Sequence, residues 1–208
     1  EGTGQTGIVL DGLELEPFTE YTVKLTAFDN MGRSASKEAY FSTGRLSVPW
    51  TAKWITDKAY SFAKDTSPAP FTFRKSFSVK KPLKRAFVTA TALGIYELNI
   101  NGKKVGNEYF APGFTSYKHS LQYNLYDIGD LLAAENTLIA VVGGGWAAGR
   151  FTYSSKSRIT CDRQAFLMEL FFEYRDGSTE KIVTDGTWQV TTQGNYRFGD
   201  FYDGETYD

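Results

Sequence analysis

The sequence predicts an all-β protein whose main part is a jelly-roll β-sandwich. Three observations carry this prediction. The chain has 208 residues of which 41% are hydrophobic and 16% aromatic, so it can bury a core. Long runs of Leu, Ala, Glu and Lys at helical spacing are missing. Short segments instead alternate hydrophobic with polar residues and are separated by Gly, Asn and Asp, which is typical of strands joined by turns.

Charge and composition exclude several classes of partner. The 23 basic and 24 acidic residues give a formal net charge of -1 and are spread along the chain, which argues against a nucleic-acid groove or an anionic membrane surface. No apolar run is long enough to cross a bilayer. We therefore expect a neutral ligand, with neither nucleic acid nor membrane as partner.

Cysteine and histidine are each present once. Cys161 excludes an internal disulfide and a zinc site with several thiolates, and it suits a reducing compartment. This slightly favours the cytoplasm over the cell surface or secretion and leaves the location open. Cys161 and His119 have no nearby partners for a dyad or triad, so we interpret both as structural. Because the chain begins with Glu1 rather than Met, we expect a piece of a longer protein.

The first expected element is a hairpin. Tyr21, Val23, Leu25 and Ala27 alternate with mainly polar residues, which predicts a half-buried strand. Residues 30–32 supply a turn, and residues 39–43 form the second strand.

The run Leu15-Glu16-Pro17-Phe18-Thr19-Glu20-Tyr21 resembles the corner of fibronectin type III domains, in which a tyrosine hydroxyl ties down the preceding loop. Only the last third of such a domain is present, so we assign residues 1–44 to its C-terminal part and expect the chain to begin mid-domain. Residues 45–58 are interpreted as a linker. Residues 59–208 form the predicted sandwich domain.

The sandwich domain opens with strands that each place hydrophobic residues on one face. Residues 71–79, 86–90 and 96–100 all show a period of two, as expected when one sheet face is wet. Asn101-Gly102 then gives a strong signal for a two-residue hairpin turn, and residues 103–105 begin the return strand.

The rest of the domain continues in the same way. A helical turn is expected at residues 127–132 and a buried strand at residues 138–142, ending in Gly143-Gly144-Gly145-Trp146. Residues 166–174 are expected to be the longest strand. After a turn at Asp176-Gly177, residues 181–184 and 188–191 complete a meander. The eight to ten strands expected from residue 55 onward suit a jelly roll.

Three segments, read in order, carry a family resemblance. They are residues 93–117 (LGIYELNINGKKVG continuing to APGFTSY), residues 135–149 (ENTL leading to GGGWAAG) and residues 203–208 (DGETYD). Together with WTAKWI at residues 50–55, they are similar to the N-terminal accessory domain of bacterial α-L-rhamnosidases of glycoside hydrolase family 78. The sequence departs from the family pattern at two places. Ala147 and Ala148 stand where bulkier residues, including an arginine, are common, and the last motif usually continues into Ala-Arg where this sequence stops.

The resemblance implies a galactose-binding-like jelly roll within a multidomain enzyme. Such enzymes cleave terminal α-L-rhamnose with inversion, using acidic residues of a separate (α/α)6 barrel further along the chain. No catalytic residue is assigned here, and we expect the chain alone to be inactive. The implied partners are the remaining domains of the parent enzyme, the barrel above all, and L-rhamnose or rhamnosides.

Some domains of this kind bind rhamnose through calcium, which takes oxygen ligands. The candidates are Asn99 and Asn101 for sugar, and Asp203 and Glu205 for calcium, within an acidic cluster that also includes Asp200 and Asp208. The alternative, which we favour, is that Asn101 only supplies the turn and the acids are solvated.

Two aromatic residues are further sugar candidates. The indole of Trp146, after three glycines, can offer a flat face to a sugar, and Tyr117 is similar. The alternative, again favoured, is an aromatic plug at one end of the sandwich. Three functions stay open: a domain that supports the barrel and contacts substrate, a calcium-dependent rhamnose-binding module, and a structural spacer. A further function, that of a self-sufficient hydrolase, predicts turnover of aryl α-L-rhamnosides, which we do not expect.

Overall fold

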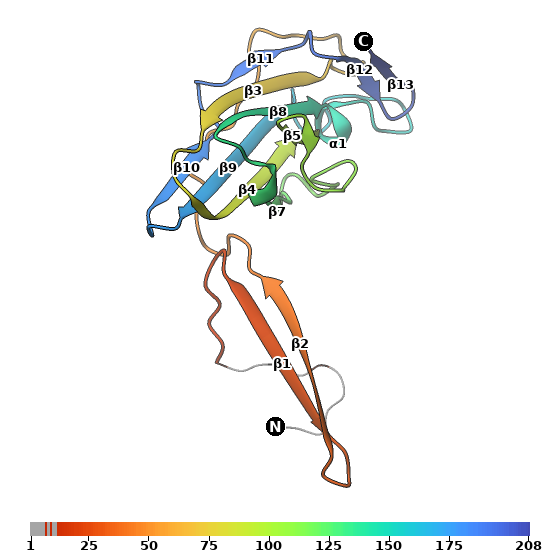
Figure 1. Cartoon of the computed structure of the whole chain (residues 1–208). Helices are drawn as coiled ribbons and strands as arrows, with labels where there is room; N and C mark the ends of the chain where they lie inside the picture. The colour runs from red at the N-terminus through yellow and green to blue at the C-terminus, as the bar shows by residue number, and fades with distance from the viewer. Residues whose placement is uncertain (1–6, 8, 10–11) are drawn as a thin grey trace. The chain divides into compact units, whose positions relative to one another are not determined.

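The computed structural model describes residues 7, 9 and 12–208. The chain divides into two compact units, one ending at Pro49 and one beginning at Trp50 (Figure 1). The two units are described separately below. The start of the predicted first domain, at residue 1, lies outside the described residues.

The first unit contains the predicted hairpin. β1 (Glu20–Phe28) and β2 (Ser34–Ser42) pair antiparallel, with Tyr21 opposite Phe41. The expected half burial of this strand is wrong: Leu25 is 59% and Phe28 72% exposed. Among the described residues of this unit there is no second layer to cover either face of the two-stranded ribbon.

The corner before β1 is tied down by a tyrosine, as its residues predict. The hydroxyl of Tyr21 accepts a hydrogen bond of 2.7 Å from the backbone N–H of Glu16, and its ring stacks on Phe41 at 5.3 Å between centroids. The Thr43 hydroxyl donates a 2.5 Å hydrogen bond to the carbonyl of Glu16. The assignment of this unit to a fibronectin-like domain stays a prediction.

The second unit is an antiparallel β-sandwich, which confirms the predicted fold class. One sheet has the order β10-β9-β4-β7 and the other the order β11-β3-β8-β5-β6. The strands of the first sheet are β10 (Thr179–Val183), β9 (Ala165–Tyr174), β4 (Leu83–Leu93) and β7 (Asn124–Asp127). Those of the second are β11 (Gln189–Thr191), β3 (Phe71–Ser78), β8 (Glu135–Gly143), β5 (Ile95–Ile100) and β6 (Lys103–Lys104).

Three small elements complete the unit. A separate hairpin, β12 (Tyr196–Asp200) and β13 (Gly204–Tyr207), follows the sandwich. The predicted helical turn is the 3-10 helix η1 (Gly129–Leu131), and the glycine-rich segment forms the one-turn helix α1 (Gly145–Ala148). None of the helices within the described ranges has both the length and the hydropathy that crossing a bilayer requires.

The core lies between the two sheets and is formed by the alternating positions that the sequence predicts. Phe71 and Phe73 of β3 and Leu98 of β5 are buried against Phe166 of β9. The rings of Phe73 and Phe166 stack at 6.1 Å. Burial of such side chains supplies about 1.5 to 3 kcal/mol each, so this layer dominates the stability of the sandwich.

The two central strands of the four-stranded sheet, β4 and β9, are buried on both faces, which the alternation did not predict. On the outer side of this sheet Phe87 stacks on Phe171 at 4.7 Å, and Thr89 of β4 and Glu169 of β9 are fully buried. The segment from Trp50 onward covers this side, because the carboxylate of Glu169 accepts hydrogen bonds from its backbone. β4, with 11 residues, is also the longest strand, so the expectation that residues 166–174 would be longest is wrong.

The predicted meander is wrong as well. β10 pairs with β9, but β11 pairs with β3 in the opposite sheet. The chain crosses between the sheets at Asp185, whose carboxylate accepts a 2.8 Å hydrogen bond from the Thr187 backbone and so forms a turn. Trp188 follows, with its indole N–H donating to the Val183 carbonyl at 2.9 Å. Residues 50–208, all of them described, contain eleven strands, β3 to β13, slightly more than expected.

Two local predictions can be compared with the structure. Asn101 and Gly102 both have positive φ, 54° and 78°, the conformation of a type I′ hairpin turn, so the predicted turn is confirmed. Within the predicted linker, Ile55 forms a β-bridge with Phe166, and the backbone N–H of Lys53 donates to Thr184. The segment from residue 50 thus packs on the sandwich, and the domain limits proposed from sequence stay a prediction.

Candidate functional site

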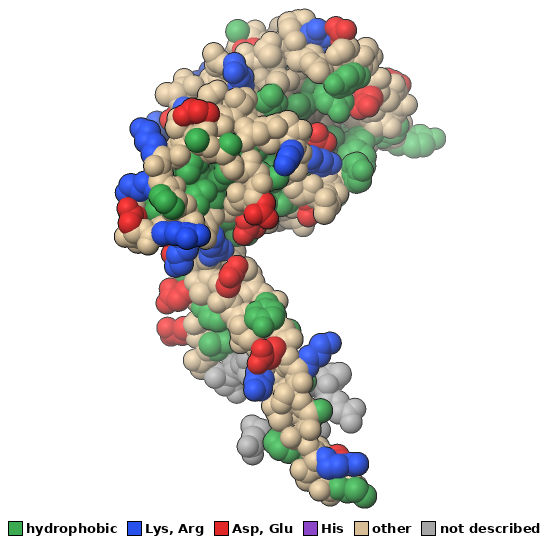
Figure 2. Space-filling model, in the orientation of Figure 1, with side chains coloured by type: hydrophobic (Ala, Val, Ile, Leu, Met, Phe, Trp, Pro, Cys, Tyr) green, Lys and Arg blue, Asp and Glu red, His purple; other side chains and the backbone are tan. Residues whose placement is uncertain are grey.

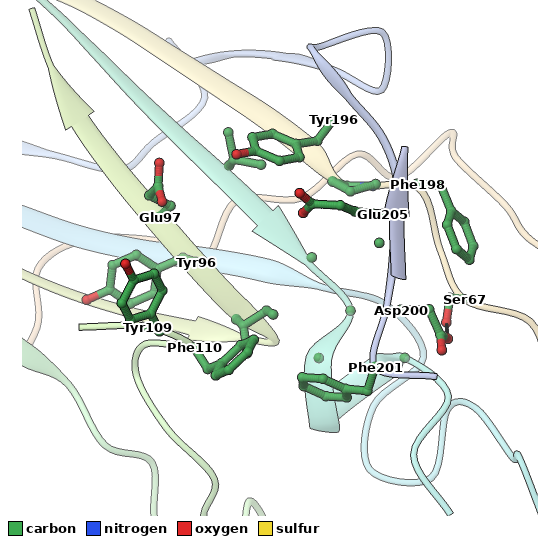
Figure 3. A pocket seen from close by; sticks show the side chains of 18 of the residues that line it. Ser67, Tyr96, Glu97, Tyr109, Phe110, Tyr196, Phe198, Asp200, Phe201 and Glu205 are labelled. Atoms are coloured by element: carbon green, nitrogen blue, oxygen red, sulfur yellow. Dashed lines mark hydrogen bonds between the residues drawn. The ribbon is translucent and has the colours of Figure 1, made fainter. Parts of the chain in front are cut away.

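A pocket of about 420 Å³ lies on the outer face of the five-stranded sheet, beneath the hairpin β12–β13 (Figure 3). Its floor follows from strand alternation. Tyr96 and Leu98 of β5 point into the core, so Ile95 and Glu97 point outward and form the floor with Val141 of β8.

Aromatic rings form the walls of this pocket. Tyr109 and Phe110, from the loop after β6, line it together with Tyr196 and Phe201 from the hairpin. Tyr109 is 82% exposed. In the orientation of Figure 2, hydrophobic side chains gather at the end of the sandwich where α1 and the hairpin lie. The pocket is therefore an apolar slot that opens to solvent.

Carboxylates supply the polar part of the pocket. Glu97, Glu108 and Glu205 line it, and Glu205 lies on the same side of the hairpin as Tyr196 (Figure 3). Glu97 is paired with Lys104 at 3.3 Å, whose ammonium lies 4.4 Å from the centroid of the Tyr109 ring. The site thus offers acceptors for hydroxyl groups beside flat apolar surfaces.

Two glycines allow the loop before α1 to approach the end of β4. Gly94 has φ 137°, and a Cβ there would lie 2.2 Å from the carbonyl oxygen of Gly143. Gly145 has φ 48°, and its Cβ would lie 2.9 Å from the backbone nitrogen of Ile95. Only glycine fits at both positions, which explains the glycine run beside the pocket.

Arg150 follows this loop and joins it to the hairpin. Its guanidinium donates to both carboxylate oxygens of Asp200 at 3.3 Å each and forms an ion pair with Asp203. The hydroxyl of Ser67 donates a further hydrogen bond to Asp200. The hydrogen bond to Asp200 raises the pKa of Arg150, with the charges of Asp200 and Asp203 acting in the same direction.

The two predicted asparagines do not line the pocket. Asn99, on the outer face of β5, donates a 3.2 Å hydrogen bond to Glu97 and so supports the floor. Asn101 donates to Leu131 and Asn136 and accepts from Thr137, each at 2.9 to 3.0 Å. These three hydrogen bonds use the side-chain amide of Asn101 to hold the turn.

The two predicted aromatic residues lie beside the pocket. Trp146 packs on Phe201 at 4.7 Å and on Phe114 at 5.9 Å between ring centroids. Tyr117 packs on the far side of Phe114 at 6.2 Å, and burial raises the pKa of its hydroxyl to about 12. Both therefore belong to an aromatic cluster that supports the Phe110 and Phe201 walls.

The predicted acidic residues separate in the structure. Glu205 lines the pocket, Asp203 and Asp200 are ion-paired with Arg150, and Asp208 is paired with Arg197 at 3.0 Å. In the part of the chain that the structure describes, no three His, Cys, Asp or Glu residues gather as a metal site. The assignment of Asp203 and Glu205 to calcium stays a prediction.

Several residues that line the pocket are missing from the sequence prediction. They are Ser67, Glu97, Tyr109, Phe110, Arg150 and Phe198. The alternation of β5 could have marked Glu97 as outward-facing, and the aromatic-rich run at residues 196–202 could have marked the hairpin. Nothing in the sequence brings Arg150 next to Asp200, because that contact spans fifty positions.

Comparison with known proteins places this architecture in a family. The family described as "Alpha-L-rhamnosidase N-terminal domain" matches residues 81–208. An α-L-rhamnosidase of Formosa agariphila is 31% identical over 195 residues, 90% of this chain and 21% of that protein. One from Alteromonas sp. is 32% identical over 187 residues, 86% of this chain and 20% of that protein. The chain thus spans about a fifth of the length of these relatives.

Solved structures agree. The native α-L-rhamnosidase from Aspergillus terreus superposes with a TM-score of 0.86 at 34% identity, over 93% of this chain and 23% of that one. The enzyme from Dictyoglomus thermophilum superposes with a TM-score of 0.84 at 32% identity, over 97% of this chain and 23% of that one. The resemblance found in the sequence is therefore confirmed, and the chain belongs to the family of α-L-rhamnosidase N-terminal domains.

Proposed function

We propose that this chain is the non-catalytic part of a longer α-L-rhamnosidase, and that its pocket binds the rhamnose unit of a rhamnoside. The observation that carries the proposal is the pocket itself, in which aromatic rings flank outward-pointing carboxylates. The volume of about 420 Å³ lies in the range of about 300 to 1,000 Å³ that is usual for small-molecule sites.

The chemistry of the lining suits a neutral sugar. An aromatic face such as that of Tyr196 or Tyr109 can pack against the C–H face of a pyranose and its methyl group. Carboxylate oxygens of Glu97 and Glu205 are acceptors for sugar hydroxyls, and such charge-assisted hydrogen bonds are about twice as strong as neutral ones. A deoxy sugar presents both kinds of surface.

The match to the N-terminal domain supports the non-catalytic role, and several carboxylates near the pocket are ion-paired. Inverting glycosidases need one carboxyl group as acid and a second as base. Asp200 and Asp203 are paired with Arg150, and Glu97 is paired with Lys104. We place the (α/α)6 barrel in the remaining four fifths of the parent enzyme and assign this domain to its support.

Isothermal titration with L-rhamnose tests the binding proposal. We expect heat of binding that persists in the presence of a chelator. Tyr109→Ala, which removes one exposed aromatic ring of the pocket lining, should weaken binding by about tenfold. The matched control is Tyr153→Ala, since Tyr153 is fully exposed and does not line the pocket, and it should bind like the wild type.

The other outcomes distinguish the rival functions. Binding that disappears with chelator and in Asp203→Ala would support the calcium-dependent rhamnose-binding module. No heat at millimolar sugar would support a structural spacer and refute the sugar site. Turnover of an aryl α-L-rhamnoside by this chain would contradict the non-catalytic assignment.

A further inference from the structure

The hairpin β12–β13 forms one wall of the pocket but belongs to neither sheet. Its strands pair with each other, from Tyr196 opposite Tyr207 to Asp200 opposite Gly204. Within the described ranges, no other strand pairs with it. A two-stranded ribbon alone is marginally stable in water, so side-chain contacts must hold this wall in place.

The strongest of these contacts are made by Arg150, which binds two carboxylates near the turn of the hairpin. Arg150 reaches from the loop after α1 and binds Asp200 through two nitrogens, Nε and Nη2, and Asp203 through Nη2. The side chain of Asp200 has no exposed surface. Removing the guanidinium would leave a buried carboxylate charge with Ser67 as its remaining side-chain partner, which is strongly unfavourable.

Arg150 is in turn held by contacts with Ser67 and with the hairpin turn. Its backbone N–H donates to the Ser67 hydroxyl at 3.3 Å, and its guanidinium lies 5.9 Å from the Tyr202 ring centroid. The hydroxyl of Tyr202 donates to the carbonyl of Phe151 at 2.7 Å, one residue further along the same loop. The loop and the hairpin turn thus form one polar joint with Arg150 at its centre.

We infer that Arg150 is a positioning residue, which holds the β12–β13 hairpin over the pocket and thereby sets how long a ligand stays bound. This inference rests on the proposed sugar site for its effect on binding, but not for its effect on the hairpin. When the joint opens, Tyr196 and Glu205 move away from the floor with the hairpin, because both are carried by its two strands.

Amide hydrogen exchange on the whole chain without sugar tests the joint. In Arg150→Ala the amides of residues 196–207 should exchange at least about tenfold faster, since each tenfold corresponds to about 1.4 kcal/mol of opening free energy. Amides of β4 and β9 should keep their protection. Arg150→Lys retains the charge but not the two-nitrogen geometry, and should lie between wild type and Arg150→Ala.

The matched control is Lys156→Ala. It removes another ion pair of the same loop, from Lys156 to Asp65 at 2.9 Å, without touching the hairpin. Exchange at residues 196–207 should then equal that of the wild type. Equal acceleration in both variants, or none in Arg150→Ala, would overturn the inference.

Should Arg150→Ala fail to fold, Asp203→Asn removes only the exposed half of the joint and leaves the Asp200 pair intact. Its hairpin amides should exchange about threefold faster, as befits an exposed ion pair worth less than about 1 kcal/mol. Unchanged exchange in a folded Asp203→Asn, in the absence of a usable Arg150 variant, would count against the joint.

Ligand kinetics separate positioning from direct contact. NMR line-shape analysis with L-rhamnose should show a dissociation rate raised about tenfold in Arg150→Ala, with the association rate changed much less. Weaker binding with unchanged hairpin exchange would mean that Arg150 contacts the sugar and would overturn the positioning role. If the wild type binds no rhamnose, the proposed function fails while the exchange experiment still decides the joint.

Discussion

The carboxylate of Glu169 and the backbone of Thr51 form a buried joint. Glu169 Oε1 accepts hydrogen bonds from the Thr51 N–H at 2.6 Å, from the Thr51 hydroxyl at 2.7 Å and from the Ala52 N–H at 2.9 Å. Glu169 is fully buried in β9, and Lys181 lies 3.7 Å from its other oxygen. One acidic residue thus fastens the segment that covers the outer face of the four-stranded sheet.

Glu169→Ala should therefore destabilise the sandwich by about 2 to 4 kcal/mol, because two backbone donors of the covering segment lose their charged acceptor. Urea unfolding followed by tryptophan fluorescence measures this, since all four tryptophans lie in residues 50–208. Glu173→Ala is the control. Glu173 lies on the same strand as Glu169, and loss of its partly exposed ion pair with Lys84 of β4 should change the free energy of unfolding by less than about 1 kcal/mol. Similar losses in both variants would refute the joint.

Tyr21→Phe should loosen the corner of the first unit while keeping the ring stack on Phe41. The Glu16 amide loses its hydroxyl acceptor, so its hydrogen exchange should rise by about three- to tenfold. Tyr40→Phe is the control, since the Tyr40 hydroxyl makes only a long hydrogen bond of 3.5 Å to the Glu38 carboxylate and binds no backbone group. An unchanged Glu16 amide in Tyr21→Phe would show that the corner does not depend on this bond.

The pH dependence of the Arg150 joint follows from Asp200. Burial by itself would raise the pKa of this carboxyl, but hydrogen bonds from Ser67 and Arg150 outweigh it, so the pKa lies below the ordinary 3.8. A carboxyl with a lowered pKa stabilises the folded state above its unfolded pKa, and this stability is lost as pH falls through the folded pKa. We expect the hairpin joint to be intact from neutral pH to about 4 and to weaken only below that.

An NMR titration of the Asp200 carboxyl carbon measures this directly. The midpoint should fall below 3.8 in the wild type and rise in Arg150→Lys. A wild-type midpoint above 3.8 would mean that burial dominates and that the joint is already weakened in mildly acidic solution.

Cys161 should react slowly with alkylating reagents. Burial raises the pKa of its thiol from 9.0 to about 11, with the nearby charge of Asp162 adding to the effect. At pH 7.5 the thiolate fraction is then about a hundredfold lower than for an ordinary cysteine, and only the thiolate reacts. The rate with iodoacetamide should therefore keep rising up to about pH 11. A plateau near pH 9 would contradict the raised pKa.

The sequence predicted elements wherever local chemistry decides structure. Asn101-Gly102 specifies its turn through two positive φ angles, and the alternation in residues 71–79 specifies which face of β3 is buried. Contacts between segments that lie far apart in the sequence were not predicted. The strand after Trp188 changes sheet rather than continuing a meander, because the partner of β11 is β3, more than a hundred residues earlier.

The same limit applied to the site. Glu205 was selected and lines the pocket, but the selection rested on an acidic cluster that the structure separates. Asn101 was selected for its position on a polar face, whereas its amide is occupied by Leu131, Asn136 and Thr137. A site built from three segments that lie far apart in sequence leaves no spacing pattern, so only its most local parts could be found.

The contact between Gly94 and the loop that contains Gly145 restricts how this protein can vary. A side chain at Gly94 would meet the Gly143 carbonyl, and one at Gly145 would meet the Ile95 side chain and, at 2.9 Å, the Ile95 backbone nitrogen, so each position has a clash with backbone. A clash with a side chain can be relieved by a second substitution, but a clash with backbone cannot. In a mutational library both positions should therefore tolerate glycine alone, and no partner mutation should rescue alanine at either of them.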